Sequence, residues 1–281
     1  MIGIVIVSYK NFQGTVKFVT KELCKILLPW KVVIVDNCSD TLSGNKLAEA
    51  CGGVCVQSQG DIQDKDERVF VLPVEDNLGY ARGNNLGAKF LLDNFDCDYL
   101  LFTNDDIVLE DADVVSKLID CFEIHEVGAV GPRVVGIDGI DQSPHHKVIT
   151  PSRQLGWKFF SLLRKRKKEN LGASEKPQSS YCYWVSGCFF LMRTEDFQSV
   201  EGFDPSTFLY AEEVILAERL KRIGKREYFC ADTHVVHYGG CSTQSIQNNK
   251  LEQILKESNC IYYRKYLHSN PIIVWLYKTF C

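Results

Sequence analysis

Short apolar runs alternate with helical stretches along the first half of the chain. Runs rich in β-branched residues predict four buried strands, at residues 2–9, 31–37, 68–74 and 98–106. Spaced apolar positions predict the helices between them, over residues 13–28, 43–51 and 83–95. Because strand and helix alternate and the strands are continuously apolar, we expect an α/β fold with a doubly wound, mostly parallel sheet.

The order of elements changes after the fourth strand. Another short strand is predicted over residues 128–135, and residues 137–180 form a long polar segment with few signals of regular structure. The segment "YWVSGCFFLMR" predicts a strand interrupted by a glycine, and "REYFCADTHVVHYGG" predicts two short strands. Between them, "AEEVILAERLKRIG" predicts a helix that stops at Gly224. The sequence shows no internal repeat.

Composition and charge restrict the class of protein. The chain has 281 residues, 45% hydrophobic and 24% charged, which fits one large domain or two small ones. The net charge of -4 gives no general reason to expect a nucleic acid partner. The first residues lack the features of a secretory signal, and no stretch approaches the roughly 20 apolar residues of a membrane-spanning helix. The 12 cysteines are scattered without a C-x-x-C pair, so we expect free thiols in a reducing cytoplasm.

Polar residues gather where the predicted strands end. Ser8 and Tyr9 close the first strand, Asp36 and Asn37 close the second, and "TNDDI" ends the fourth. Adjacent carboxylates repel each other and stay together where solvent or a cation compensates them. Taken alone, the acidic triplet favours a simple turn, since Asn and Asp are common in turns. The convergence of three strand ends favours a ligand site, because ligands of such sheets bind beyond the carboxyl ends of the strands.

Seven motifs occur in an order that is typical of a known family. They are "VIVSYK", "VDNCSD", "NLGYARGNNLG", "FTNDDI", "SGCFFLMR", "EGFDPSTFLYAEE" and "HVVHYGG". On these motifs the chain resembles the family 2 glycosyltransferases over roughly residues 2–245, especially the branch that includes bacterial rhamnosyltransferases. The resemblance implies a GT-A fold, a nucleotide-sugar donor, a divalent cation and inversion at the anomeric carbon. It also implies a glycosyltransferase domain at 1–245, with a nucleotide-sugar-binding half at 1–110 and an acceptor and catalytic half at 111–245, before a C-terminal helical extension at 246–281.

The strand ends of the first half supply the nucleotide contacts that we expect. Asp36, beside Asn37, can accept a hydrogen bond from an imide or amino N–H of the base. Ser8 and Tyr9 can hold the base and ribose through backbone and ring. The alternatives are an Asp that only starts a turn and a Tyr that only packs.

The motif "NLGYARGNN" offers contacts to phosphate and sugar. Gly79 and Gly83 permit a close approach of the backbone to a ligand. Arg82 can donate to phosphate or sugar oxygens, and Asn84 and Asn85 can bind hydroxyls. The motif is not a P-loop, since no GK[ST] follows, and a glycine-rich helix start is the alternative.

The acidic triplet has a metal-binding role in the family. The resemblance makes Asp106 the expected direct ligand, with Asn104 at the first position of the D-x-D-like triplet and Asp105 facing the sugar. His237 would add an imidazole, although a lone His after a strand is often simply packed or exposed. Oxygen ligands favour Mg²⁺ or Mn²⁺, and an imidazole favours Mn²⁺. The cation would offset charge on the leaving diphosphate.

An inverting transfer also needs a carboxylate that takes the proton of the acceptor hydroxyl. The family places an Asp second in an "ED" pair at a helix start, and Glu213 occupies that position here, preceded by Glu212. The chain departs from the family in this Glu for Asp, and in Ile215 where a second acid is common. The alternative is a pair of acids that stabilises the helix N-terminus through its dipole, by ~0.3–1 kcal/mol.

Two segments combine aromatic and basic residues. Residues 155–168 end in five consecutive basic residues, and the C-terminal stretch "YYRKYLHSNPIIVWLYKTF" is similar in character. Both could lie on an anionic bilayer, and a solvated loop and a packed helix are the alternatives.

The sequence therefore predicts an inverting, metal-dependent glycosyltransferase of the cytoplasm, with possible peripheral membrane contact. It would move a sugar from a nucleotide-diphosphate donor, such as dTDP-rhamnose or a UDP-sugar, to a glycan or lipid-linked glycan acceptor in cell-surface polysaccharide synthesis. The competing hypotheses are a nucleotidyltransferase, for which "VIVSYKNFQGT" is a poor phosphate loop, and a degenerate sugar-nucleotide-binding protein, which the unusual "AEEVI" favours.

Overall fold

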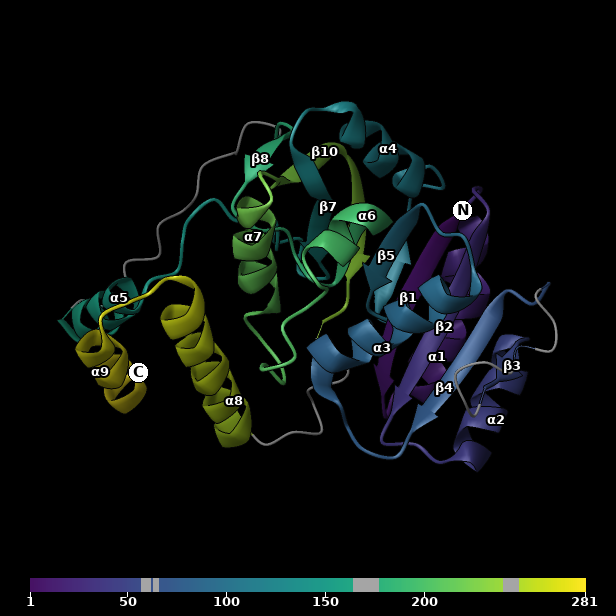
Figure 1. Ribbon diagram of the computed structural model, residues 1–281, viewed down its shortest axis with the longest axis horizontal. Coiled ribbons are helices and arrows are strands. Elements are labelled where there is room, and N and C mark those ends of the chain that lie inside the picture. Colours follow the sequence, from purple (N-terminus) through teal and green to yellow (C-terminus); the bar gives the residue numbers. More distant parts are fainter. Residues whose placement is uncertain (57–61, 63–65, 164–176, 240–247) are drawn as a thin grey trace.

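The first half of the chain forms the parallel part of one sheet. In the computed structural model, which describes residues 1–56, 62, 66–163, 177–239 and 248–281, the strand order is β3-β4-β2-β1-β5-β9-β7-β10-β6 (Figure 1). The parallel strands are β1 (Ile2–Tyr9), β2 (Trp30–Asn37), β3 (Val54–Cys55), β4 (Val69–Val74) and β5 (Tyr99–Thr103). The four strands predicted here are present, and the two-residue strand β3 was missed because it is too short to show a pattern.

The second half of the sheet is mixed. The remaining strands are β6 (Ile107–Leu109), β7 (Val127–Gly136), β8 (Ser180–Cys182), β9 (Phe189–Arg193) and β10 (Arg226–His237). β9 runs antiparallel to β5 and β7, whereas β10 is parallel to β7 and antiparallel to β6 and β8. The predicted pair of short strands at the end of this half is wrong, since β10 is one strand with a shift of register between Cys230 and His234.

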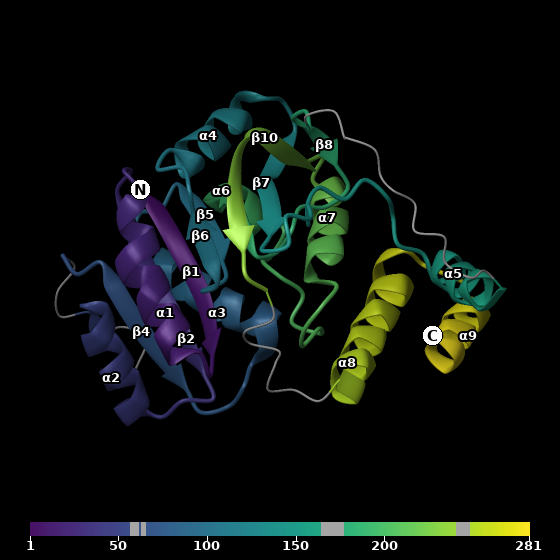
Figure 2. The same ribbon diagram turned by 180° about the vertical axis from the view of Figure 1, so that it is seen from behind.

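Helices cover both faces of the sheet. One face carries α1 (Phe12–Lys17), which continues as η1 (Phe18–Glu22) and η2 (Leu23–Lys25), together with α2 (Thr41–Cys51) and α4 (Val114–Asp120), after which η3 (Cys121–Glu123) follows (Figure 2). The other face carries α3 (Gly79–Asn94), α6 (Thr194–Ser199) and α7 (Glu212–Arg222) (Figure 1). Asp40 begins α2 by accepting a hydrogen bond from the Ser43 backbone, which satisfies one of the free N–H groups of the first turn.

Two apolar layers result from this arrangement. Successive side chains of a strand point to opposite faces, so Ile4 and Ile6 of β1 enter the cluster beneath α1 and α2, while Val5 enters the cluster beneath α3. All three are fully buried. Because both faces are covered, the strands read as continuous apolar runs, which is why the sequence predicted them.

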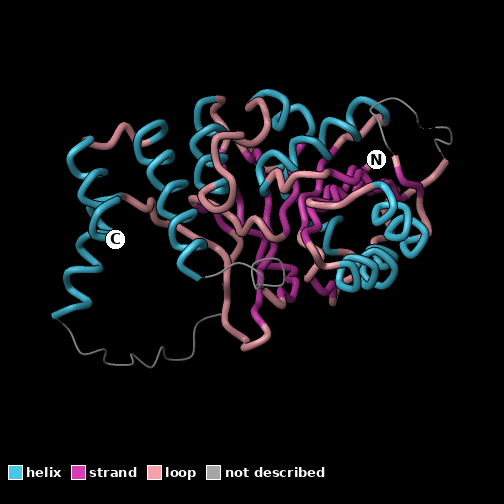
Figure 3. The backbone as a smooth tube through the Cα atoms, turned by 90° about the horizontal axis from the view of Figure 1, so that it is seen from below, coloured by secondary structure: helices cyan, strands magenta, loops and turns pink. Residues whose placement is uncertain are grey.

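The C-terminal helices and α5 form a group at one end of the molecule (Figure 3). They are α5 (Pro151–Leu163), α8 (Asn248–Ile261), η4 (Tyr262–Tyr266) and α9 (Pro271–Phe280). Helix α5 lies inside the segment that the sequence showed as long, polar and poor in structure, so that interpretation is wrong at this point. None of the helices in the described ranges combines the length and apolar character that a membrane crossing needs. The predicted boundary at residue 245 lies outside the described residues.

Candidate active site

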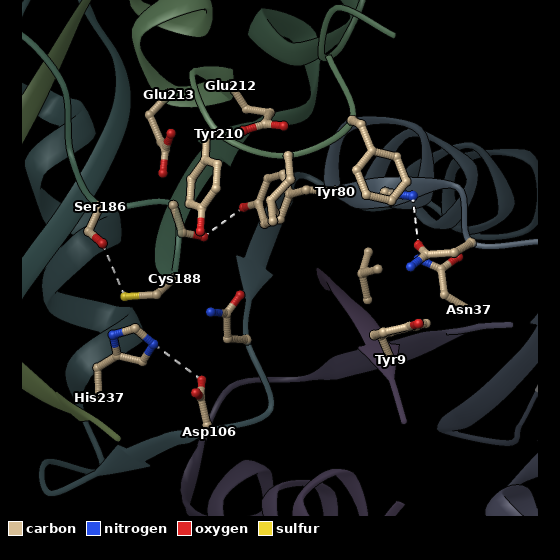
Figure 4. Close-up of a pocket in the computed structure, with 17 residues that line it drawn as sticks. Tyr9, Asn37, Tyr80, Asp106, Ser186, Cys188, Tyr210, Glu212, Glu213 and His237 are labelled. Carbon is tan, nitrogen blue, oxygen red and sulfur yellow. Dashed lines mark hydrogen bonds and ion pairs between the residues drawn. The ribbon is translucent and has the colours of Figure 1, made fainter. Parts of the chain in front are cut away.

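A cavity of about 380 Å³ opens at the carboxyl ends of the central strands. Tyr9 and Asn37, at the ends of β1 and β2, line it from the first half of the chain. From the second half come Gly187, just before β9, Glu213 in the first turn of α7, and His237 at the end of β10. Figure 4 shows the side chains of Tyr9, Asn37, Glu213 and His237 around one space. The topology thus brings together residues from the first strand, β1, and from the last, β10.

A carboxylate and an imidazole meet on one wall of this cavity. The Oδ1 atom of Asp106 lies 3.3 Å from Nε2 of His237 (Figure 4). The other ring nitrogen of His237, Nδ1, lies 2.7 Å from Oε1 of Gln142, which fixes the direction of the ring. Burial alone would lower the pKa of His237, but the neighbouring Asp106 carboxylate and Cys188 side chain raise it to about 10.

This pair has the donor atoms that a hard or borderline divalent cation prefers. One carboxylate oxygen and one imidazole nitrogen face each other, and a second partner orients the imidazole, as is usual for a ligating histidine. Asn104 lines the same cavity, so its amide lies within the site as well. Among the described residues no cluster of three or more His, Cys, Asp and Glu side chains could hold a metal ion. A cation here would therefore need further oxygen ligands from a substrate or from water.

Asp105 faces the other way. Its carboxylate accepts hydrogen bonds from Thr15 Oγ1 at 2.5 Å and from Asn11 Nδ2 at 2.9 Å, both at the start of α1. Burial raises the pKa of this carboxyl, although those hydrogen bonds lower it in part. The side chain is buried and does not line the cavity, so the expectation that Asp105 faces the sugar is not supported.

Two further predicted nucleotide contacts lie off the cavity. The Ser8 hydroxyl is buried and shares a 2.7 Å hydrogen bond with Thr15 Oγ1. Asp36 is not among the residues that line the cavity, and burial raises the pKa of its carboxyl, which accepts a hydrogen bond from Ser39. Of the four residues predicted at the first two strand ends, the structure therefore brings Tyr9 and Asn37 to the cavity.

Arg82 and Asn85 also differ from the expectation. Arg82 Nε donates to the carbonyl of Pro205 at 2.9 Å. Asn85 makes two hydrogen bonds to the backbone of Phe203, one to its carbonyl at 2.8 Å and one from its N–H at 2.9 Å. Neither side chain lines the cavity. Both instead hold the loop at 203–210, which forms part of the cavity wall.

The same loop is held from two other directions. Gly79, with φ of 76°, packs so closely on the carbonyl of Phe208 that a side chain there would clash, and the next N–H, of Tyr80, donates to that carbonyl at 2.8 Å. On the far side, Asp204 accepts hydrogen bonds from Lys265 and Tyr266, both at 2.7 Å. Burial would raise the pKa of Asp204, but these hydrogen bonds hold it well below its usual range.

The loop ends at two adjacent glutamates. Tyr210 and Ala211 have positive φ angles of 72° and 68°, an unfavourable conformation that turns the chain sharply into α7. Glu212 is 4% exposed, and burial together with the charge of Glu213 raises its pKa to about 8. Burial therefore favours the protonated form of Glu212.

Glu213 lies against the segment before β9. A side chain at Gly187 would come within 2.6 Å of Glu213 Oε1, so this position requires glycine. The backbone N–H of Gly187 donates to the Glu213 carboxylate, and burial still raises the pKa of that carboxyl. On the other side of the same residue, the Tyr80 hydroxyl donates to the Gly187 carbonyl at 2.6 Å.

Several lining residues were not predicted individually. They are Asn77, Tyr80, Ser186, Gly187, Cys188, Phe208 and Tyr210. Each stands inside one of the motifs "NLGYARGNN", "SGCFFLMR" and "GFDPSTFLYAEE" or directly before it, so the motifs were the available signal. Their positions on three separate loops gave no chemical reason to choose one residue over its neighbours.

Similarity to known proteins agrees with this arrangement. The family model described as "Glycosyl transferase family 2" matches residues 4–200. The chain belongs to glycosyl transferase family 2. The family predicted from the seven motifs is confirmed, and the protein is a glycosyltransferase.

Curated relatives of this glycosyltransferase include rhamnosyltransferases. It is 24% identical over 275 residues to the rhamnosyltransferase WbbL of Escherichia coli (strain K12), which covers 96% of each chain. It is 28% identical over 193 residues to an N-acetylglucosaminyl-diphospho-decaprenol L-rhamnosyltransferase of Mycobacterium tuberculosis, which covers 62% of this chain and 60% of that one.

Solved structures with the same fold confirm the GT-A prediction. One is a mannosyltransferase from Pyrobaculum calidifontis in complex with GDP-Man and Mn2+, with a TM-score of 0.58 at 13% identity. The match covers 99% of this chain and 68% of the mannosyltransferase chain. GalNAc-T7 with UDP, GalNAc and Mn2+ has a TM-score of 0.58 at 15% identity and covers 93% of this chain and 49% of its own.

Proposed function

We propose that this glycosyltransferase moves one sugar from a nucleotide-diphosphate donor to a hydroxyl group of a glycan, with inversion at the anomeric carbon. One observation carries the proposal. The Asp106–His237 pair and the Glu213 carboxylate face the same cavity from different walls (Figure 4). An inverting transfer needs this arrangement, with the diphosphate compensated on one side and a proton acceptor for the incoming hydroxyl on the other.

A divalent cation belongs to the proposal. Asp106 and His237 would hold it, with Asn104 beside them, and their mixed oxygen and nitrogen donors suit Mn²⁺ or Mg²⁺. When bound, such a cation supplies Lewis-acid stabilisation of the charge that develops on the leaving diphosphate. Tyr9 and Asn37 lie where the base and ribose of the donor would bind, at the ends of β1 and β2.

Glu213 is the proposed general base. The N–H of Gly187 contacts its carboxylate, and burial raises the pKa of Glu212 behind it, so we assign the proton of the pair to Glu212 and its negative charge to Glu213. A raised pKa makes this carboxylate a better proton acceptor than an exposed glutamate would be. Tyr80 has a positioning role, because its hydroxyl donates to the carbonyl of Gly187, the residue whose N–H contacts Glu213.

The donor and acceptor classes follow from the relatives. Two of them are named as rhamnosyltransferases, and one acts on an acceptor whose name contains a polyprenyl diphosphate. We therefore propose dTDP-rhamnose or a UDP-sugar as the donor and a lipid-linked glycan of a cell-surface polysaccharide as the acceptor, on the cytoplasmic side of the membrane. The division at residues 110 and 245 remains part of this proposal, with one sheet shared by both halves.

The rival function is binding of a sugar nucleotide without turnover, which the Glu212–Glu213 pair in place of Glu–Asp favours. Thermal unfolding with UDP, dTDP or GDP, each with and without Mn²⁺, would first identify the nucleotide. A ligand at a hundred times its Kd stabilises the folded state by about 2.7 kcal/mol, and we expect this for one nucleotide only when Mn²⁺ is present.

Turnover separates the two functions. The sugar donor of the identified nucleotide is incubated with a panel of saccharide and polyprenyl-diphosphate acceptors, and release of the nucleotide diphosphate is followed together with the anomeric configuration of the product. An inverted glycoside supports the proposal. Mn²⁺-dependent binding without product on any acceptor would favour the binding protein, and a retained configuration would exclude Glu213 as the base of a direct displacement.

A further inference from the structure

Two helices far from the cavity project at one end of the molecule and lie side by side. α5 and α9, called the arm from here on, are adjacent in both views of the ribbon (Figures 1 and 2). Leu155 of α5 packs against the apolar cluster that contains Val274 and Tyr277 of α9, and Lys158 Nζ donates to the carbonyl of Cys281 at 3.3 Å. The inner face of α9 is therefore covered.

The arm exposes several large apolar side chains. Five large apolar side chains are exposed there, at Trp157 (56%), Phe159 (68%), Ile272 (67%), Trp275 (58%) and Phe280 (58%). Exposed apolar residues elsewhere on the described surface are scattered over many elements, which is normal for a folded protein. Among the described residues, both exposed tryptophans lie on the arm, and tryptophan is the residue that prefers the boundary between lipid and water.

The charge of the arm differs in sign from that of the whole chain. Arg153, Lys158 and Lys278 lie on its two helices, whose sequences contain no Asp or Glu, although the net charge of the chain is -4. The Arg153 guanidinium stacks over the Trp157 ring at 4.8 Å, so a cation and an interfacial aromatic are paired on α5. The neighbouring basic residues 164–168 lie outside the described residues, and the inference does not use them.

The arm is joined to the wall of the cavity by hydrogen bonds. Tyr277 of α9 accepts a hydrogen bond from Asn259 Nδ2 of α8 at 3.0 Å, and the neighbouring Ser258 donates to the carbonyl of Leu209 at 2.8 Å. Leu209 lines the cavity. The orientation of the arm on a surface therefore fixes the orientation of the cavity relative to that surface.

We propose that the arm docks on an anionic lipid bilayer, with its tryptophans and phenylalanines in the interface and its cations against the headgroups. Exposed aromatic side chains beside basic residues, without acidic ones, match the chemistry of such a surface. The inference deepens the proposed function and rests on its lipid-linked acceptor, because the arm would hold the enzyme on the surface that carries such an acceptor.

Flotation of the full chain with vesicles tests the inference without donor or acceptor, so its outcome is independent of catalysis. The vesicles contain phosphatidylcholine alone or phosphatidylcholine with phosphatidylglycerol. We expect binding to the anionic vesicles that weakens as salt rises. Replacing Arg153, Lys158 and Lys278 with Gln should weaken binding about fivefold per cation, or roughly a hundredfold in total.

A second variant removes the aromatic contacts, through Trp157→Ser, Phe159→Ser and Trp275→Ser. Its matched control carries Leu42→Ser, Ile137→Ser and Ile140→Ser, three equally exposed apolar residues (63%, 68% and 64%) away from the arm. We expect the arm variant to lose vesicle binding, and the control to bind as the unmodified chain does.

Three results would overturn the inference. The first is that the unmodified chain does not bind anionic vesicles at low salt, and the second is that the arm and control variants lose vesicle binding equally. The third is a concentration-dependent dimer in sedimentation velocity that only the arm variant abolishes, while vesicle binding is absent. Circular dichroism of each variant shows whether it is folded. If the aromatic variant does not fold, the three-cation variant, whose side chains are at the surface, decides.

Discussion

The two halves of the sheet use their polar side chains differently. In the parallel half, Ser8, Asp105 and Asn85 stand near strand ends or at the start of a helix, and their side chains bind other parts of the protein. In the mixed half, Glu213 and His237 point into the cavity. The parallel half therefore contributes mainly structural contacts. The loops and strand ends of the mixed half contribute most of the side chains that we propose for the reaction.

The neighbouring residues Asp105 and Asp106 show where the division lies. Both are in the turn between β5 and β6, but the first is satisfied by donors at the start of α1 and the second lies beside His237. A buried carboxylate needs hydrogen-bond partners or a compensating charge. Asp105 has hydrogen-bond partners, and Asp106 has the imidazole of His237. Adjacent acids in a motif can therefore have unrelated roles.

The comparison is tested most strongly by Asp106→Ala. The substitution removes the carboxylate that would hold the cation, so we expect turnover to fall by roughly a thousandfold or more, since Lewis-acid stabilisation is worth several kcal/mol. Mn²⁺-dependent nucleotide binding, measured by isothermal titration calorimetry, should disappear as well. Nucleotide binding that responds to Mn²⁺ as in the unmodified protein would place the cation elsewhere.

Glu213→Gln tests the opposite wall. Glutamine keeps the size and the hydrogen bond from Gly187 but cannot accept a proton, so the rate of transfer should fall by about 10²–10⁴-fold. Donor binding, measured as the thermal shift with nucleotide and Mn²⁺, should be retained. The matched variant is Glu212→Gln, which should keep most of the activity, because burial favours the protonated form of Glu212. A larger loss in Glu212→Gln than in Glu213→Gln would exchange the two roles.

The sequence predicted the parallel half better than the mixed half for a physical reason. Strands covered on both faces are continuous apolar runs, such as "IGIVIVSY", and cannot be mistaken for loops. The short strand β6 and the six-residue helix α6 owe their existence to tertiary contacts, and their sequences carry no clear period.

The site could be predicted as far as motifs and strand ends reach. Asn37 was predicted as a site residue from its position after a strand, and Asp106 and His237 from the family motifs; all three line the cavity. The direction of a side chain is set by its partners in three dimensions, so the contacts of Asp105 with Thr15 and of Arg82 with Pro205 could not be read from the chain. Their roles in the reaction remain predictions.

Asp105→Ala sharpens the contrast with Asp106. The substitution removes the acceptor of the Asn11 amide and one of the acceptors of the Thr15 hydroxyl, which can still donate to the Asn11 carbonyl, and we expect a loss of about 1–3 kcal/mol in the free energy of unfolding by urea. At a temperature well below the midpoint of thermal unfolding, kcat should change less than tenfold. A large fall in kcat at unchanged stability would restore the role of Asp105 at the sugar.

The smallest expected effect on turnover concerns Glu212 of the buried glutamate pair, where the mixed half combines structure and catalysis. Glu212 faces Glu213, the Thr207 hydroxyl and the backbone of Tyr210, and its pKa is about 8 in the folded protein against 4.5 for an ordinary glutamate. Between these values the folded state holds a proton that the unfolded state has lost. The contribution of this group is therefore fully present below pH 4.5 and declines as the pH rises to about 8, by ~1.4 kcal/mol per pH unit.

Glu212→Gln removes this titration, so its free energy of unfolding should decline less steeply than that of the unmodified protein between pH 5 and 8, and the variant should be the more stable of the two at pH 8. Glu227 also has a raised pKa, but it titrates in both proteins and largely cancels in the difference. Urea unfolding at a series of pH values measures the two curves. Parallel curves would mean that Glu212 is already ionised in the folded state, and would remove the reason for assigning the negative charge of the pair to Glu213.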